Sequence, residues 1–422
     1  MTHRSPLHAL HEQAEALVAA YGPPVREGEP PVGVVQTFGE LEVEYAAIRK
    51  SCILLDTPHR ATLEVRGSER LPFLNRMLTQ ELKDLGSWHA RPSFWLNRKG
   101  RIDADLRVLC LPDRILLDLD VHAAQRTRAG LDAFIIADDV ALADLTESTA
   151  RFALHGPTAR TLLAEAADPA SGAADVANLE PWRLTTLRLA DAEIVVLRDD
   201  TAGEVGLELF VPAGHAVAVY RRLVEVGSDP GLTIDGSRPT TGHRVRLRPA
   251  GWLAYNIARI EAGTPLYNID FGPESLPAET GILEQRVSFT KGCYLGQEIV
   301  ARMHSRGKPK QKLVALLAEL PPAPAARDRE TGLPLQPVGG SPVFKKPAGT
   351  PLDAWVPAEA DRVGALTSAT LAPMRGSAPI CFAQVRTEHA EPGAELVIAA
   401  EGYPLKAVVQ PTLTFFSRSS NA

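Results

Sequence analysis

The chain opens on apolar residues spaced as on one face of a helix. They follow Ser5-Pro6, where serine suits a helix cap and proline the first helical position, and they are Leu7, Leu10, Ala14, Leu17 and Val18. Gly22-Pro23-Pro24 ends the pattern, since proline cannot continue a helix. We therefore expect an N-terminal helix followed by a polar, proline-rich linker, together residues 1–33.

From residue 34 onward, alternating apolar runs and helical patterns follow one another twice. The first unit has strand patterns at 61–65, 94–96, 104–111 and 114–119, and helical patterns at 67–82 and 122–134. The second has strand patterns at 151–154, 194–197 and 207–211, and helical patterns at 158–166 and 213–226. Hairpins within each unit favour two interleaved α+β subdomains, residues 34–312, over one doubly wound sheet.

The last part of the chain has a different character. Residues 321–357 contain nine prolines and several glycines, which indicates a loop or linker. Short strand patterns then follow at 362–367, 380–385, 395–398 and 405–409. Short strands separated by turns predict an antiparallel β-barrel, within a third domain at residues 313–422. The fold class expected for the whole chain is α+β.

Composition narrows the range of functions. The 422 residues are 45% hydrophobic and 23% charged, and the net charge of −6 gives no general attraction to nucleic acid or to acidic membranes. No apolar run approaches the length of a membrane span, and the N-terminus lacks the apolar core of a signal peptide. We therefore expect a cytoplasmic protein with no membrane partner and no direct nucleic-acid binding.

The four cysteines are far apart in the sequence. Cys52, Cys110, Cys293 and Cys381 form no C-x-x-C pair, which argues against a structural zinc site and against a disulfide framework. We expect no metal site. One cysteine nevertheless stands out, because Cys293 lies within Lys-Gly-Cys-Tyr-Leu-Gly-Gln-Glu, residues 291–298, just before an amphipathic run that predicts a helix.

A thiol near a helix N-terminus faces unpaired backbone N–H groups, and Lys291 adds a cation two residues earlier. Both favour the thiolate and predict a reactive Cys293. The alternative is a small buried core residue, since free cysteines are commonly buried.

Several segments, taken in order, carry a family resemblance. They are 44–49 with Leu55-Asp56, 65–69, 96–105, His155-Gly156-Pro157 with Ala159, 203–209, 259–263, 277–279 and 364–368. In this order they resemble the folate-binding family of the glycine-cleavage T-protein. The segment 291–298 resembles the mark of its YgfZ-type branch, whose relatives assist iron–sulfur maturation.

The resemblance implies a three-domain ring with a central channel for tetrahydrofolate or a one-carbon derivative. It also implies a role supporting iron–sulfur client or assembly proteins, including enzymes that modify tRNA. The alternative is a tetrahydrofolate-dependent aminomethyltransferase or demethylase of the T-protein type, and a third reading is a tRNA-associated binding module.

Two departures from the T-protein pattern bear on activity. The family's paired aspartates are interrupted here, as Asp103-Ala104-Asp105, and the family's Ala-Arg-Asp motif is replaced by Ala254-Tyr255-Asn256. Residues two apart on a strand still share a face, so both aspartates could line one surface.

The expected site has two groups of residues. Those proposed for catalysis are Cys293, Lys291, Asp103 and Asp105, and those proposed for folate binding are Asn97, Glu204, Glu208, Arg259, Glu261, Tyr294 and Gln297. A carboxylate can accept from the adjacent N–H groups of a pterin, and Glu204 is the stronger family match. The alternatives are a solvated strand face for the aspartates, loop acids for Glu204 and Glu208, a structural ion pair for Arg259 and Glu261, and a helix-dipole partner for Gln297.

A basic run follows the cysteine segment: Arg302, His304, Arg306, Lys308, Lys310 and Lys312. It could meet the glutamate tail of folate or a phosphate. The alternative is an edge strand, which lysines and a proline protect against aggregation.

Overall fold

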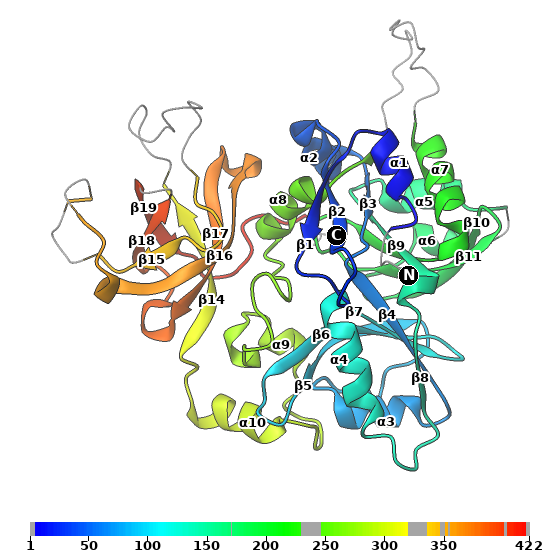
Figure 1. Cartoon of the computed structure of the whole chain (residues 1–422), viewed down its shortest axis with the longest axis horizontal. Coiled ribbons are helices and arrows are strands. Elements are labelled where there is room, and N and C mark those ends of the chain that lie inside the picture. The colour runs from blue at the N-terminus through cyan, green and yellow to red at the C-terminus, as the bar shows by residue number, and fades with distance from the viewer. Residues whose placement is uncertain are drawn as a thin grey trace, which may run out of the picture.

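The computed structural model describes residues 5–169, 171–228, 246–319, 336–346, 351–352, 355–400 and 403–418. Two sheets and a closed barrel make up its three bodies (Figure 1). The two interleaved α+β subdomains and the C-terminal antiparallel barrel predicted from the sequence are confirmed.

The five-stranded sheet has the order β5-β6-β7-β4-β8. Its strands are β4 (Arg60–Arg66), β5 (His89–Leu96), β6 (Ile102–Cys110), β7 (Ile115–Asp120) and β8 (Ala141–Asp144), with α3 (Arg70–Met77) and α4 (Val121–Asp132) beside them. Leucine, isoleucine and valine side chains of these strands fill one core. Because apolar burial drives this packing, the alternation visible in the sequence was enough to locate four of the five strands.

The six-stranded sheet has the order β10-β11-β12-β9-β3-β13. It contains β9 (Thr149–His155), β10 (Leu184–Leu189), β11 (Ala192–Arg198) and β12 (Gly206–Pro212), and the helices α5 (Ala159–Ala166), α6 (Ala173–Ala177) and α7 (Ala216–Gly227). The early strand β3 (Ile53–Asp56) pairs with β9, and the short β13 (Arg248–Pro249) pairs in parallel with β3. This exchange interleaves the two subdomains.

The closed barrel has the order β14-β17-β16-β15-β18-β19. Its strands are β14 (Gln311–Ala318), β15 (Pro342–Phe344), β16 (Arg362–Ala372), β17 (Ala378–Arg386), β18 (Glu395–Ala400) and β19 (Tyr403–Val409). The basic run does not form an edge strand. It spans the end of α10 (Gln297–Arg306) and the start of β14, which pairs with β17 and β19 on its two sides.

A central segment connects the three bodies. It comprises α8 (Trp252–Ala262), α9 (Leu283–Arg286) and α10, with α2 (Leu41–Lys50) packed on α8. In Figure 1, α8 lies between the barrel and the two sheets.

The predicted N-terminal helix is shorter than expected. Helix α1 spans only His8–Gln13, Glu15 has a left-handed backbone with φ of 52°, and β1 (Leu17–Tyr21) pairs with β2 (Val32–Thr37). Leu7 and His11 are buried, whereas Leu17 is 60% exposed. The helical spacing of apolar residues in the sequence therefore extends past the residues that pack against the rest of the protein. The expected domain boundary at residue 33 falls inside the β1–β2 ladder.

Candidate functional site

Strand β6 carries three charged side chains on one face, which we call the charged row. Asp103, Asp105 and Arg107 alternate with buried apolar residues and are half-buried, as expected for side chains on one face of a strand. The expectation that the two aspartates share a face is confirmed.

Arg107 connects the two sheets. Its Nε lies 2.6 Å from Asp118 Oδ2 of β7, while its Nη1 lies 2.8 Å from Asp199 Oδ2 and 3.5 Å from Glu208 Oε1 of β12. A carboxylate of β7, one of β12 and one from the residue just after β11 therefore meet at one guanidinium.

Two further arginines complete this cluster. Arg151 Nη1 lies 2.6 Å from Asp118 Oδ1, and Arg60 Nη2 lies 3.0 Å from Asp118 Oδ2. Burial alone would raise the pKa of Asp118, but the three guanidiniums hold it well below its usual range. Three arginines thus balance three acids. We call Arg60, Arg107, Arg151, Asp118, Asp199 and Glu208 the arginine cluster.

Sequence reasoning missed most of the arginine cluster. The only available signal was a charged residue inside an otherwise apolar strand, as with Asp118 in Leu116-Leu117-Asp118-Leu119. Such residues are rarely buried without partners, but the sequence does not say which distant strand supplies them.

Two members of the arginine cluster stand out: Asp199 has a shifted pKa, and Arg151 has buried donor atoms without hydrogen-bond partners among the described residues. Burial raises the pKa of Asp199 to about 6, although Arg107 opposes the shift. The Nε and Nη2 atoms of Arg151 are buried and have no hydrogen-bond partner among the described residues, although Nη2 lies 3.5 Å from Glu208 Oε2. Two buried donor atoms of Arg151 are therefore not satisfied by hydrogen bonds within the described residues.

The hairpin before β6 holds Asp103. Asn97 Nδ2 donates to Asp103 Oδ1 at 3.2 Å, and the Asn97 side-chain oxygen accepts from the backbone N–H groups of Lys99 and Arg101. Asp105 is paired with Arg286 of α9 at 2.8 Å. The expected residues Asn97, Asp103 and Asp105 therefore lie together.

Glu204 lies in a different environment from Glu208. It is 3% exposed, and its Oε1 lies 3.5 Å from Arg49 Nη1 and 3.7 Å from Arg418 Nε. Burial raises the pKa of Glu204 despite these cations. Glu208, and not the expected stronger match Glu204, is the glutamate that joins the arginine cluster.

Arg259 and Glu261 do not form an ion pair with each other. The shared face considered for them required a strand, but both lie in α8, where residues two apart point in different directions. Arg259 binds Asp270 at 2.7 Å and donates to Ser368 Oγ of the barrel at 2.6 Å. Glu261 instead binds Arg49 at 2.5 Å and accepts from Tyr45 at 2.6 Å. Both residues are fully buried and fasten α8 to its neighbours.

Cys293 is exposed, whereas Cys52, Cys110 and Cys381 are buried. The predicted helix after it is confirmed as α10, but α10 begins at Gln297, four residues beyond the thiol. The thiol is therefore presented on a loop before the first helical turn.

Lys291 does not face the thiol as expected. Its Nζ donates to the carbonyl oxygens of Asn75 at 2.6 Å, Leu78 at 2.7 Å and Gln80 at 2.9 Å, at and beyond the C-terminal end of α3. Burial lowers the pKa of Lys291 to about 8. Lys291 anchors the loop, because helix C-termini present carbonyls without intrahelical donors.

Tyr294 and Gln297 also contact the loop and its anchor. Tyr294 is buried, with its ring centroid 5.3 Å from Lys291 Nζ, and Gln297 Nε2 donates to Gly292 O at 3.4 Å. In this structure these contacts hold the loop and do not extend to the arginine cluster.

A cavity of about 750 Å³ is lined on one side by the N-terminal hairpin of β1 and β2. Tyr21 stacks on His122 with centroids 5.6 Å apart, and Trp252, Gln36 and Asn268 also line the space. The side chains of Tyr21 and Asn268 both donate to buried Asp120. Flat aromatic walls with a few polar groups suit a planar heteroaromatic ligand.

The cavity and the charged row are linked through neighbouring residues. Tyr267, next to Asn268, donates to the carbonyl oxygen of Asp103 at 2.9 Å. Trp252 contacts Tyr255 with centroids 5.7 Å apart. In the sequence, Pro23 and Pro24 indicate only a helix stop, so the pattern does not predict the cavity wall that the hairpin forms.

Within the described ranges, no helix is long and apolar enough to cross a membrane. In the same part of the chain, no three His, Cys, Asp or Glu side chains gather closely enough to hold a metal ion.

Residues 18–291 match the model of the GCVT N-terminal domain. The chain is 26% identical over 416 residues to an aminomethyltransferase of Desulfitobacterium hafniense, covering 98% of both proteins. It is 28% identical over 286 residues to an aminomethyltransferase of Caldanaerobacter subterraneus, covering 66% of this chain and 69% of the relative.

A solved structure has the same fold along its whole length. The crystal structure of glycine cleavage system aminomethyltransferase T from Bartonella henselae superposes with a TM-score of 0.76 at 21% identity, over 98% of each chain. Because the family model covers well over half of the 422 residues, the chain belongs to the GCVT family of aminomethyltransferase-like proteins.

Proposed function

We propose that this protein binds tetrahydrofolate beside β6 and supports the maturation or repair of iron–sulfur proteins, with Cys293 as its reactive group. The observation that carries the proposal is the exposure of Cys293 while the other three cysteines are buried. The loop that carries Cys293 packs against the hairpin before β6, which contains Asn97. A buried cysteine at 293 would have left only a core residue.

The cavity and the arginine cluster have the chemistry to hold a reduced folate. The cavity of about 750 Å³ has aromatic walls from Tyr21, His122 and Trp252 for flat rings. Glu208 offers a carboxylate that can accept from the adjacent amide and amino groups of a pterin. When bound, tetrahydrofolate would supply a carrier for one-carbon groups. Trp252 and Tyr21 would orient its rings, and Glu208, held between Arg107 and Arg151, would fix the polar edge.

The carboxylates of β6 are poorly placed to act as free bases in this structure. Asp105 is paired with Arg286, and Asp103 accepts from Asn97. Tyr255, which replaces the arginine of the T-protein motif, is buried and donates to Thr201 Oγ1 at 3.0 Å. These contacts support a binding role for the row in preference to T-protein catalysis.

A second candidate is a tetrahydrofolate-dependent aminomethyltransferase. It is favoured by overall similarity, since the relatives that cover nearly the whole chain are named aminomethyltransferase. Asp103 and Asp105 also share the face that such a reaction would need.

One set of experiments separates the two functions. Purified protein is titrated with tetrahydrofolate by calorimetry, and is then assayed for methylenetetrahydrofolate formation from aminomethylated carrier protein. A deletion strain is scored for iron–sulfur enzyme activities and for glycine cleavage, with Cys293→Ser as the complementing variant. Turnover by the purified protein that survives Cys293→Ser would establish the aminomethyltransferase. Folate binding without turnover, together with lost iron–sulfur activities that the wild type restores and Cys293→Ser does not, would establish the accessory role.

A further inference from the structure

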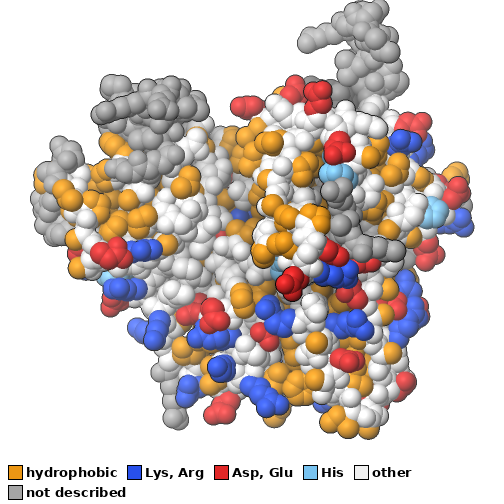
Figure 2. All heavy atoms as spheres, viewed as in Figure 1, with side chains coloured by type: hydrophobic (Ala, Val, Ile, Leu, Met, Phe, Trp, Pro, Cys, Tyr) orange, Lys and Arg blue, Asp and Glu red, His pale blue; other side chains and the backbone are white. Residues whose placement is uncertain are grey.

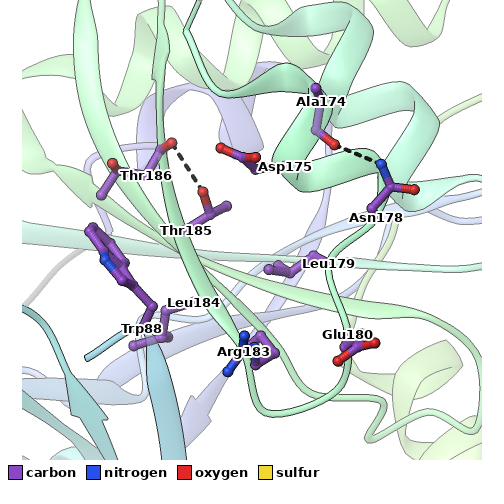
Figure 3. Close-up of a pocket in the computed structure, with 10 residues that line it drawn as sticks. All are labelled: Trp88, Ala174, Asp175, Asn178, Leu179, Glu180, Arg183, Leu184, Thr185 and Thr186. Atoms are coloured by element: carbon purple, nitrogen blue, oxygen red, sulfur yellow. Dashed lines mark hydrogen bonds between the residues drawn. The ribbon is translucent and has the colours of Figure 1, made fainter. Parts of the chain in front are cut away.

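A second cavity, of about 740 Å³, lies away from β6 at the edge of the six-stranded sheet (Figure 3). Helix α6, the loop after it and the start of β10 line it, with Trp88 from the segment before β5 on the opposite side. Its size falls in the range of small-molecule sites. None of its lining residues belongs to the folate site proposed above.

Trp88 is held in a costly conformation. Its φ is 67°, a left-handed value that a bulky residue rarely adopts. Its backbone is fixed on both sides, because its N–H donates to Cys110 O at 2.7 Å and its carbonyl accepts from Leu184 N–H at 2.9 Å. Glycine would adopt this conformation without strain.

Burial of the Trp88 side chain does not offset this backbone strain. Trp88 is 37% exposed, and its indole borders the open cavity. Trp182 makes a useful contrast, because it also has a positive φ, of 61°, but packs against a buried apolar cluster. A strained residue with an exposed ring points to a use for the ring itself.

The cavity also contains charges without partners. Asp175, Glu180 and Arg183 all line the space: the two acids are exposed, Arg183 is half-buried, and none of the three belongs to an ion pair within the described residues. The buried apolar side chains of Leu179 and Leu184 also line the cavity. An acid and an aromatic face that line one cavity favour a cation, which the π-face attracts, whereas Glu180 lies across the cavity from Trp88 in Figure 3.

We propose that this cavity binds a small zwitterionic ligand of the amino-acid or betaine class. The cationic nitrogen lies over the indole of Trp88, on the side that faces the carboxylate of Asp175. The carboxylate of the ligand meets Arg183, which provides a fork of donors for it. This site is independent of the proposed folate site.

Three probes test the charge assignment: glycine betaine as the zwitterion, tetramethylammonium as the cation alone, and acetate as the anion alone. Each is titrated into the full-length protein by calorimetry and by NMR of the indole N–H signals. We expect glycine betaine to bind most tightly, tetramethylammonium at least tenfold more weakly, and acetate not to saturate. Arg183→Gln should reduce glycine betaine binding to the level of tetramethylammonium, and Asp175→Asn should abolish binding of both, whereas Glu180→Gln should change neither.

Trp88→Gly distinguishes a ligand-binding tryptophan from a structural one. Glycine relieves the left-handed strain, so this variant should keep a wild-type melting temperature but lose glycine betaine binding. Trp182→Gly is the matched control and should lower the melting temperature while leaving binding intact in the folded protein. The proposal is overturned if glycine betaine gives no saturable signal up to high millimolar concentration, or if Trp88→Gly binds it as the wild type does.

Discussion

Gly296 and Asn97, two hundred residues apart, are in backbone contact: a Cβ at Gly296 would lie 2.8 Å from the carbonyl oxygen of Asn97. The same Cβ would lie 3.2 Å from Gly100 Cα, and a Cβ at Gly100 would meet Ile299 at 2.8 Å. The thiol loop and the hairpin that holds Asp103 therefore pack through two glycines. This contact places the cysteine loop and the 97–105 hairpin side by side.

Gly296→Ala should separate the loop from the hairpin. Gly296 also has a φ of 80°, so alanine would add left-handed strain to the clash, for a loss of at least about 2 kcal/mol of unfolding free energy. Urea denaturation measures this loss. Gly292→Ala is the control, because a Cβ there meets nothing within 4 Å. Equal stability of the two variants would contradict the contact.

Cys293 should be the one cysteine of the four that reacts rapidly in the folded protein. Burial raises the pKa of the Cys52, Cys110 and Cys381 thiols, which reduces both their thiolate fraction and their access to reagent. Iodoacetamide labelling at neutral pH, resolved by mass spectrometry, should modify Cys293 first and the others only after unfolding. Rapid native-state labelling of Cys52 would refute this.

Lys291 should matter for stability and not for thiol reactivity. Lys291→Met removes a donor from three carbonyls, which should cost about 3 kcal/mol, while the labelling rate of Cys293 should change little as long as the protein stays folded. Lys83→Met, at an exposed position, is the control. A large fall in the Cys293 labelling rate in folded Lys291→Met would restore the role in thiolate formation first expected for this lysine.

The pKa of Lys291, lowered to about 8, adds a pH signature. The Lys291 side chain binds its proton less tightly in the folded state than in the unfolded state, where the pKa of a lysine is about 10.4. Stability relative to Lys291→Met should therefore rise as pH increases from about 8 towards 10. Denaturation curves of both proteins across this window measure the difference.

The sequence predicted the elements far better than it predicted their partners. Local alternation was sufficient to find β6, β7 and the strands of the barrel, since each buries one or both faces against a core. The arginine cluster was missed because Arg107 and Glu208 are brought together only by the packing of two sheets. The predicted N-terminal helix was too long because the spacing of apolar residues does not show where contact with the rest of the protein ends.

Asp199 should make stability depend on pH in the acid range. Its pKa is raised to about 6, so its contribution is complete below the unfolded value of about 3.9 and is lost as pH rises through 6. Asp199→Asn should remove a decline on the order of 2 kcal/mol between pH 4 and pH 7. Asp191→Asn, on an exposed turn, is the control. Identical pH profiles for Asp199→Asn and the wild type would show that Arg107 keeps Asp199 ionised throughout.

Glu208 and Glu204 should separate folate binding from stability. Glu208 joins the arginine cluster beside the β6 row, so Glu208→Gln replaces one acceptor oxygen with a donor that opposes the N–H groups of a pterin. We expect at least tenfold weaker tetrahydrofolate binding, about 1.4 kcal/mol. Glu204→Gln instead leaves buried Arg49 with one fewer counter-charge, so it should lower the melting temperature and leave the affinity nearly unchanged. Calorimetric titrations and thermal melts of both variants decide the matter. If Glu204→Gln is the variant that loses affinity, the pterin lies beside Arg49 and not beside the arginine cluster, and the site proposed here is misplaced.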